Sequence, residues 1–251
     1  MTLQSPPVQA RAAPEKAMAA RLTTAQVYEA WRRKILDHTI PPSTKVNIHH
    51  LSQEFGVSPT PVREALRLLQ GDNLLVATSN KGYATTAILD EQGVRDLFEF
   101  RLLFEPWAAG AVAGNRLINP SKALRDELQR FKEHPENIKH SLISHDNLFH
   151  TAILDAAGNQ VVLTAFQQSH CHLHLFRMYN EDWDRRSTVA EHEEIERAIS
   201  AGSPVEAEEA MRNHLHQAYR RFRHASADPK ETSENPTIRR GNNPRLIDST
   251  Q

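Results

Sequence analysis

Four side chains in the second half of the chain have the chemistry of a metal site. Asp146 and His150 lie four residues apart, so on a helix both would project from one face. His192 and His214 lie in later helical segments, and a bundle can bring three such helices together. One carboxylate and three imidazoles suit Zn²⁺, Ni²⁺, Mn²⁺ or Fe²⁺ and leave one or two positions for water or a ligand. The Asp146–His150 spacing is also typical of a solvated ion pair, so the pattern alone leaves both interpretations open.

Other histidines offer a competing interpretation, since the chain has 14 of them. His170 and His174 share a helix face near His172 and could bind metal, although histidines at the surface are the commoner explanation. His145 and His216 neighbour the candidate ligands, but helical phase points them elsewhere.

Arg101 lies in the unusually apolar segment 98–109, where a guanidinium needs a partner. That partner is either Glu105, four residues later, or the carboxylate of a bound ligand. The residues alone favour the internal pair.

Residues 57–66, Val-Ser-Pro-Thr-Pro-Val-Arg-Glu-Ala-Leu, predict a DNA-recognition helix together with its start. Ser58 is a good N-cap, and Pro59 suits the first helical position because its missing N–H is not needed there. The apolar residues fall on one face (Val62, Ala65, Leu66 and Leu69). The opposite face carries Thr60, Arg63 and Arg67, which can reach base edges and phosphates.

The flanking residues complete a winged helix-turn-helix over 21–88. A helix is expected over 24–36, and a short one over 48–55, which Gly56 ends with a tight turn. Two β-prone runs, 74–78 and 83–88, then surround a wing tip that contains Lys81 and Gly82.

The rest of the chain predicts a six-helix all-α bundle over 89–225, so the fold class is mainly α. The expected helices span 90–113, 121–134, 138–157, 161–179, 189–201 and 203–224. Such a bundle is large enough for a central cavity. The two ends, 1–20 and 226–251, lack periodicity and are expected to be disordered.

Composition is that of a folded cytoplasmic protein, with 39% hydrophobic and 24% charged residues. No apolar run approaches the roughly 20 residues needed to span a bilayer, and no apolar signal core is visible. The single Cys171 excludes an intrachain disulfide and fits a reducing compartment. The net charge is −1, but residues 21–88 carry eight Lys or Arg against five Asp or Glu, which allows phosphate binding.

Five motifs resemble one known family. Residues 56–66 resemble the Gly-Val-Ser-x-Thr-Pro-Val-Arg-Glu-Ala-Leu hallmark of GntR-type transcription regulators. The bundle is similar to the FCD effector domain of the FadR-like subfamily. The matching segments are Arg-Leu-Leu-Phe-Glu-Pro-Trp-Ala-Ala at 101–109, Asp-Asn-Leu-Phe-His at 146–150, Glu-His-Glu-Glu-Ile at 191–195 and Met-Arg-Asn-His-Leu at 211–215.

The resemblance implies a ligand-responsive transcription regulator, not an enzyme, that represses as a homodimer on an inverted-repeat operator. It implies a divalent metal, zinc first among the candidates, held by Asp146, His150, His192 and His214. A small organic acid would bind above the metal through its carboxylate, with Arg101 as a credible second contact. We expect the first bundle helix to transmit binding to the wing that it follows.

DNA contacts are expected from the recognition helix and the wing: Ser58, Thr60, Arg63, Arg67, Lys81 and Gly82. Arg63 suits a guanine contact, while Thr60, Arg67 and Lys81 would meet the backbone. Many family members carry an arginine where this chain has Pro59. Because proline cannot donate a hydrogen bond, the operator is expected to differ from the family's usual sequence.

Two alternatives remain at this point. One is a metal-free regulator that binds an acyl thioester or another apolar effector. The other is a metalloenzyme, although no general-base or nucleophile motif accompanies the histidines and a recognition helix serves no catalytic purpose. The residues leave open the effector, the metal and the controlled genes.

Overall fold

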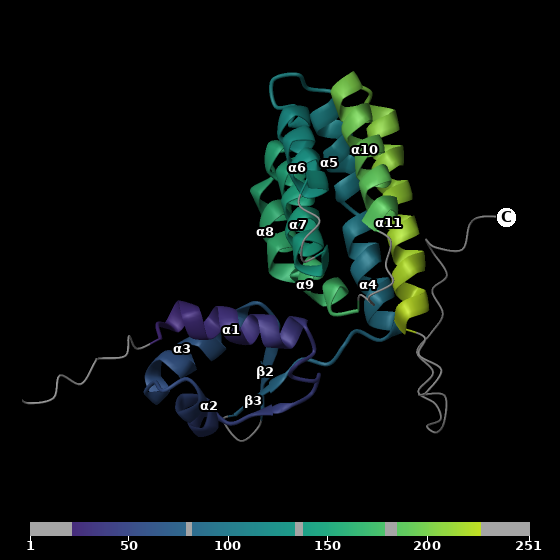
Figure 1. Ribbon diagram of the computed structural model, residues 1–251. Coiled ribbons are helices and arrows are strands. Elements are labelled where there is room, and N and C mark those ends of the chain that lie inside the picture. The colour runs from purple at the N-terminus through teal and green to yellow at the C-terminus, as the bar shows by residue number, and fades with distance from the viewer. Residues whose placement is uncertain (1–21, 79–81, 134–137, 179–184, 227–251) are drawn as a thin grey trace, which may run out of the picture.

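The computed structural model describes residues 22–78, 82–133, 138–178 and 185–226. Of the ends expected to be disordered, 1–20 and 226–251, only Ser226 lies within these ranges, where it ends a helix; the other residues of both ends lie outside them, as does Lys81. Figure 1 shows a small N-terminal unit below a helical bundle. The predicted fold class is therefore confirmed. Among the described helices, none is long and apolar enough to cross a membrane.

The N-terminal unit is the predicted winged helix-turn-helix. Its helices are α1 (Thr24–Leu36), α2 (Ile48–Glu54) and α3 (Pro59–Gly71). Its strands are β1 (Lys45–Val46), β2 (Leu75–Ala77) and β3 (Tyr83–Thr85). They form one antiparallel sheet in the order β1-β3-β2, in which Ala84 pairs with both Lys45 and Val76. The pairing of β1 was not predicted, because a two-residue strand leaves no alternation to detect.

Two of the three helices in this unit begin with a side-chain N-cap hydrogen bond. The Thr23 side chain accepts from the backbone N–H of Gln26, whose own side chain bonds back, which completes a capping box before α1. The Asn47 side chain accepts from the N–H of His50 and starts α2. Ser58 occupies the N-cap position of α3, but its side chain makes no capping hydrogen bond.

The bundle contains more helices than predicted, because two of the expected six are broken. Its described helices are α4 (Glu91–Leu102), α5 (Glu105–Ala113), α6 (Ser121–Glu133), α7 (Ile138–Ala156), α8 (Gln160–Ser169), α9 (Cys171–Phe176), α10 (Arg185–Ala201) and α11 (Pro204–Ser226). Helix α11 packs along α5, α4 and α10.

Each break has a local cause. The predicted helix 90–113 is interrupted at Phe104, because Pro106 has no N–H to offer the carbonyl of Leu102 and its ring crowds that position. The predicted helix 161–179 ends at His170, whose backbone is left-handed with φ +46°, and α9 restarts there in a new direction.

The two units share part of a core. Helix α9 lies at the end of the bundle that faces α1 in Figure 1. Ile143 on α7 and Leu173 and Phe176 on α9 are buried in the same cluster as Val27 and Trp31 of α1. The bundle therefore covers apolar surface of the helix-turn-helix unit.

Candidate functional site

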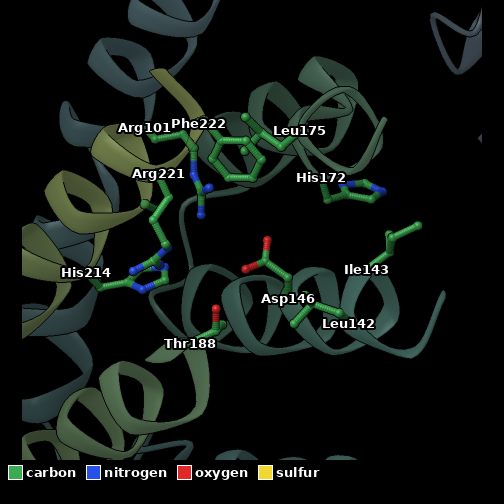
Figure 2. A pocket seen from close by; sticks show the side chains of 11 residues that line it. Arg101, Leu142, Ile143, Asp146, His172, Leu175, Thr188, His214, Arg221 and Phe222 are labelled. Carbon is green, nitrogen blue, oxygen red and sulfur yellow. The ribbon is translucent and has the colours of Figure 1, made fainter. Parts of the chain in front are cut away.

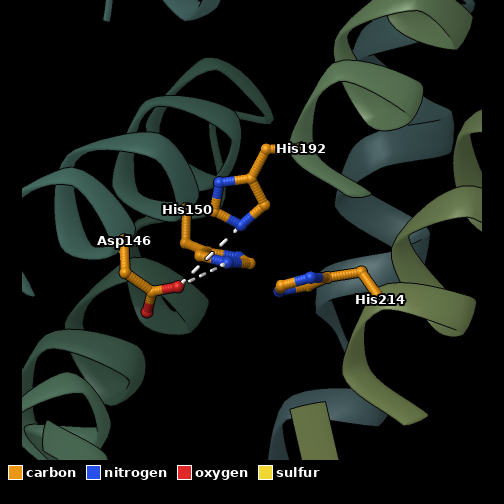
Figure 3. Close-up of side chains that lie close together, drawn as sticks. All are labelled: Asp146, His150, His192 and His214. Atoms are coloured by element: carbon orange, nitrogen blue, oxygen red, sulfur yellow. Dashed lines mark ion pairs between the residues drawn. The ribbon is translucent and has the colours of Figure 1, made fainter. Parts of the chain in front are cut away.

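Three bundle helices bring the four candidate metal ligands together. Asp146 and His150 come from α7, His192 from α10 and His214 from α11, and their ligand atoms all lie within 4.8 Å of one another. Figure 3 shows the carboxylate and the three imidazoles converging on one point. The histidine side chains are 0–2% exposed, so the cluster lies in the interior.

The inward nitrogens of the three imidazoles have no hydrogen-bond partner. The Nε2 atoms of His150, His192 and His214 are all buried and unpaired. Asp146 Oδ1 lies 3.5 Å from His150 Nε2 and 3.9 Å from His192 Nε2, as ion pairs. Leaving a buried polar atom unpaired costs about 1–3 kcal/mol, so three such atoms at one point indicate a missing electron-pair acceptor.

The opposite nitrogens of two of these rings face carboxylates. His150 Nδ1 lies 2.6 Å from Glu105 Oε2, and His214 Nδ1 lies 2.8 Å from Glu191 Oε2. Arg221 in turn donates to both oxygens of Glu191. The contact of His214 is a hydrogen bond, which holds the proton on Nδ1 and leaves the Nε2 lone pair directed inward, whereas His150 Nδ1 makes an ion-pair contact without hydrogen-bond geometry.

The charges of the site suit metal binding. Burial raises the pKa of Asp146, but His150 and Arg101 outweigh it and hold that pKa well below its usual value. Burial, with the neighbouring His214 and His150, holds the pKa of His192 well below its usual value, and burial also lowers the pKa of His214. Asp146 is therefore ionised and these two imidazoles are neutral near pH 7, which are the states that a metal requires.

His150 is the exception. Burial lowers its pKa, but the carboxylates of Glu105 and Asp146 outweigh burial and raise it. A cation at the inward nitrogens would take the place of that proton.

The geometry fits one transition-metal ion. Zinc–nitrogen bonds are about 2.0–2.1 Å long, so two ligands on opposite sides of an ion lie roughly 4 Å apart. The spread of 4.8 Å needs only small side-chain movements to reach that value. Three imidazoles and one carboxylate match the donors that zinc and nickel prefer.

A small cavity of about 20 Å³ opens beside the cluster. Asp146 and His214 line it together with Arg101, and Figure 2 shows the Arg101 guanidinium directed toward Asp146. The rest of the lining combines polar and apolar groups: Leu142, Ile143, His172, Leu175, Thr188, Ala218, Arg221 and Phe222. The cavity thus places a buried cation opposite the candidate metal ligands.

Arg101 forms the internal pair that the residues favoured. Its Nε donates to Glu105 Oε1 at 2.6 Å and its terminal nitrogen to Oε2 at 3.2 Å, with both residues 1% exposed. Burial raises the pKa of Glu105, but Arg101 and His150 outweigh it and bring that pKa to about 2. Because Arg101 also lines the cavity, the internal pair and a ligand contact do not exclude each other.

The competing histidines do not gather into a second metal group among the described residues. His170 forms the left-handed junction between α8 and α9. His172 lines the cavity, and His174 lines an open groove beside α4. Both are partly buried rather than on the surface, and burial lowers the pKa of each to about 4.

His145 is the residue whose role helical phase did not reveal. It was expected to point away from the ligands, yet its ring is 1% exposed and its Nε2 lies 2.9 Å from His192 Nδ1. Helical phase gives the direction of a side chain on its own helix only. The contact between His145 on α7 and His192 on α10 depends on how these two helices lie relative to each other.

Four of the candidate DNA residues are exposed on α3 or at its N-cap. Ser58, Thr60 and Arg63 are exposed at the start of α3, while Arg67 is paired with Glu64 at 2.8 Å. Arg63 also lines an open hollow with residues 46–49 and Pro59. The side chains of α3 that are expected to contact DNA are thus exposed to solvent.

The wing brings Gly82 close to Thr78. The carbonyl of Gly82 accepts from the backbone N–H of Thr78 at 2.9 Å, and a Cβ on Gly82 would lie 3.0 Å from Thr78 Oγ1. A larger residue would therefore crowd the turn. Lys81 lies outside the described residues.

Comparisons with known proteins match both units. Residues 23–84 match the family described as bacterial regulatory proteins, gntR family, and residues 96–217 match the FCD domain. The chain is 24% identical over 210 residues to the HTH-type transcriptional regulator YdhC of Bacillus subtilis, covering 82% of this chain and 93% of YdhC. It is 24% identical to the HTH-type transcriptional repressor GlaR of Escherichia coli, covering 77% and 93%.

A solved structure supports the fold. The GntR transcriptional regulator from Rhodococcus sp. RHA1 superimposes with a TM-score of 0.64 at 20% identity, covering 79% of this chain and 96% of that one. At this identity the likeness concerns the arrangement of the helices and not the ligand.

Proposed function

Because the chain belongs to the GntR family of bacterial transcription regulators and carries an FCD domain, we propose that a small organic acid controls its binding to DNA. In this proposal residues 21–88 bind DNA and residues 89–225 bind the effector. The protein acts as a repressor, the function for which its relative GlaR is named, and as a homodimer on an inverted repeat. It is a regulator and not an enzyme, in keeping with its relatives.

One observation carries the effector side of this proposal. Three unpaired Nε2 atoms and one ionised carboxylate converge beside a cavity that Arg101 lines. Asp146, His150, His192 and His214 would hold the metal, zinc first among the candidates. The bound ion would supply a positive charge for carboxylate oxygens, and Arg101 would orient the same group.

The cavity favours a small acid over an acyl effector. The cavity is small, and its lining includes Thr188, His172 and two arginines, which offer polar contacts to a compact anion. A long acyl chain needs far more apolar volume. The metal-free alternative would also leave the three inward nitrogens without an electron-pair acceptor.

In this proposal, effector binding affects the DNA-binding unit through α9 as well as through α4. Leu175 lines the effector cavity, while Leu173 and Phe176 lie in the core shared with α1. Arg177, directly after α9, donates to the side chain and carbonyl of Thr86 at 2.6 Å. A ligand that moves α9 therefore acts on both the α1 packing and the segment before α4.

Binding to DNA tests the proposal directly. Purified homodimer is used to select binding sequences from random duplexes, and the selected duplex is then titrated by fluorescence anisotropy. We expect one or more mono-, di- or sugar acids to weaken binding at least fivefold, and we expect that response to disappear after complete metal removal by a chelator. A response that survives without metal would contradict the metal's role, and failure to select any sequence would contradict the regulator itself.

A further inference from the structure

A chain of buried polar contacts leads from α6 to the metal ligand His192. Glu127 Oε1 on α6 lies 3.2 Å from His145 Nδ1 on α7, and His145 Nε2 lies 2.9 Å from His192 Nδ1 on α10. The three residues are 8%, 1% and 0% exposed. His192 is thus the one ligand histidine whose outer nitrogen faces another imidazole instead of a carboxylate.

The order of donors in this chain follows from Glu127. An ionised carboxylate only accepts hydrogen bonds, and Glu127 is also paired with Arg130. In the tautomer in which His145 Nδ1–H donates to Glu127, His145 Nε2 is an acceptor. His192 Nδ1–H must then donate to His145, and the lone pair of His192 lies on Nε2, facing Asp146.

Aromatic packing holds both rings in the required planes. His145 stacks on Phe131 with ring centroids 4.2 Å apart and 4° between the planes. His192 stacks on Phe149 at 4.1 Å and 5°. Neither ring can turn without losing a buried stack, so the direction of the two hydrogen bonds is built into the core.

We propose that Glu127 and His145 are positioning residues that keep His192 in the Nδ1–H tautomer and thereby direct its Nε2 at the metal. The inference rests on the metal site of the proposed function and assigns a role to two residues outside the ligand set. Outer partners of this kind raise metal affinity by orienting a ligand, without touching the ion.

Two substitutions at one position separate orientation from packing. In His145→Phe the ring is kept for stacking on Phe131, but the acceptor for His192 and the donor for Glu127 are lost. In His145→Gln the amide oxygen can accept from His192 while the amide nitrogen donates to Glu127. Glu133→Gln, an exposed change later on α6, is the matched control.

The first measurement is the affinity for Zn²⁺ alone, by competition with a chromophoric chelator. We expect His145→Phe to bind about 10–100-fold more weakly than the wild type, and His145→Gln and the control to stay within about threefold. Equal affinity in the wild type and a folded His145→Phe variant would overturn the proposal, as would His145→Gln binding as weakly as His145→Phe.

The second measurement needs no metal and no variant. Nitrogen-15 NMR of the metal-free wild type reports which imidazole nitrogen of His192 carries the proton. We expect Nδ1–H, and a dominant Nε2–H form would overturn the proposal even if no variant folds. A wild type that binds no Zn²⁺ at all would instead contradict the proposed metal site, so the two failures are distinguishable.

Discussion

The buried Arg101–Glu105 pair combines a structural and a binding function in two side chains. Glu105 accepts both hydrogen bonds from Arg101 and also faces Nδ1 of the ligand histidine His150. A buried pair gains little over apolar packing, but removing one partner leaves the other charge without compensation. The pair is therefore more sensitive to substitution than its i,i+4 spacing would indicate.

Glu105→Gln should destabilise the fold by about 3–5 kcal/mol, because it leaves the Arg101 guanidinium buried and uncompensated. Urea denaturation followed by far-UV circular dichroism measures this change. The exposed pair Lys122–Asp126 has the same i,i+4 spacing and serves as the matched control. Asp126→Asn should leave the unfolding midpoint unchanged within error, and equal effects of the two substitutions would contradict the role assigned to burial.

Two arginines on the exposed face of α3 should differ in their effect on DNA binding. Arg63 is expected to read a base, so Arg63→Ala should lose about 1–3 kcal/mol of discrimination between the selected duplex and one altered at a single base pair. Arg67 is expected to meet phosphate, so Arg67→Ala should weaken binding to both duplexes equally. Anisotropy titrations with the two duplexes measure these effects. Selectivity that survives in a folded, dimeric Arg63→Ala protein would contradict the assigned role.

At the scale of the elements, the local sequence was enough to predict a helix whose bounds depend on its own residues alone. The helices expected over 24–36 and 48–55 match α1 and α2 to within one residue, and the apolar face predicted for α3 is buried. The breaks at Phe104 and His170 were missed for different reasons. The Pro106 signal was present in the sequence, whereas a left-handed histidine has no local signature and depends on the packing of α9.

In the candidate site, too, features of one helix could be predicted from the sequence, whereas contacts between helices could not. The Asp146–His150 spacing is a property of one helix and was visible in the sequence. From the residues alone the convergence of His192 and His214 was one open possibility, and only the resemblance favoured it, because no local pattern tells how α10 and α11 pack. The contact of His145 with His192 was missed because it too depends on packing between helices.

Arg177 should hold the segment that joins the wing to α4. In Arg177→Met the hydrogen bonds to Thr86 and Ala87 are lost, and bonds to a charged group contribute about 1.5–3 kcal/mol. The backbone amide of Thr86, which donates to the Leu74 carbonyl, should therefore exchange with deuterium about 10–100-fold faster. Arg125→Met, which removes hydrogen bonds to Glu196 and Ser200 on α10 instead, is the control. Unchanged exchange at Thr86 would show that α9 does not restrain this segment.

At the scale of the whole molecule, α7 connects the metal site directly with the core of the DNA-binding unit. Ile143 on α7 lies in the core shared with α1, and the same helix carries Asp146 and His150 one and two turns later. A metal that fixes these ligands also restrains the helix that covers the helix-turn-helix core. The units should therefore unfold together, even though each has secondary structure of its own.

This coupling predicts that zinc stabilises the DNA-binding unit without touching it. Trp31 lies in the shared core, and Trp107→Phe with Trp183→Phe leaves it as the single fluorescent tryptophan. Zn²⁺ at about 100 times its dissociation constant adds about 2.7 kcal/mol, which should raise the melting temperature by roughly 5–10 °C. We expect Trp31 fluorescence and far-UV circular dichroism to shift by the same amount, and His150→Ala to abolish both shifts. A Trp31 transition that zinc leaves in place, while the helical signal moves, would mean that the shared core transmits nothing, and the effector would then have to act through α4 alone.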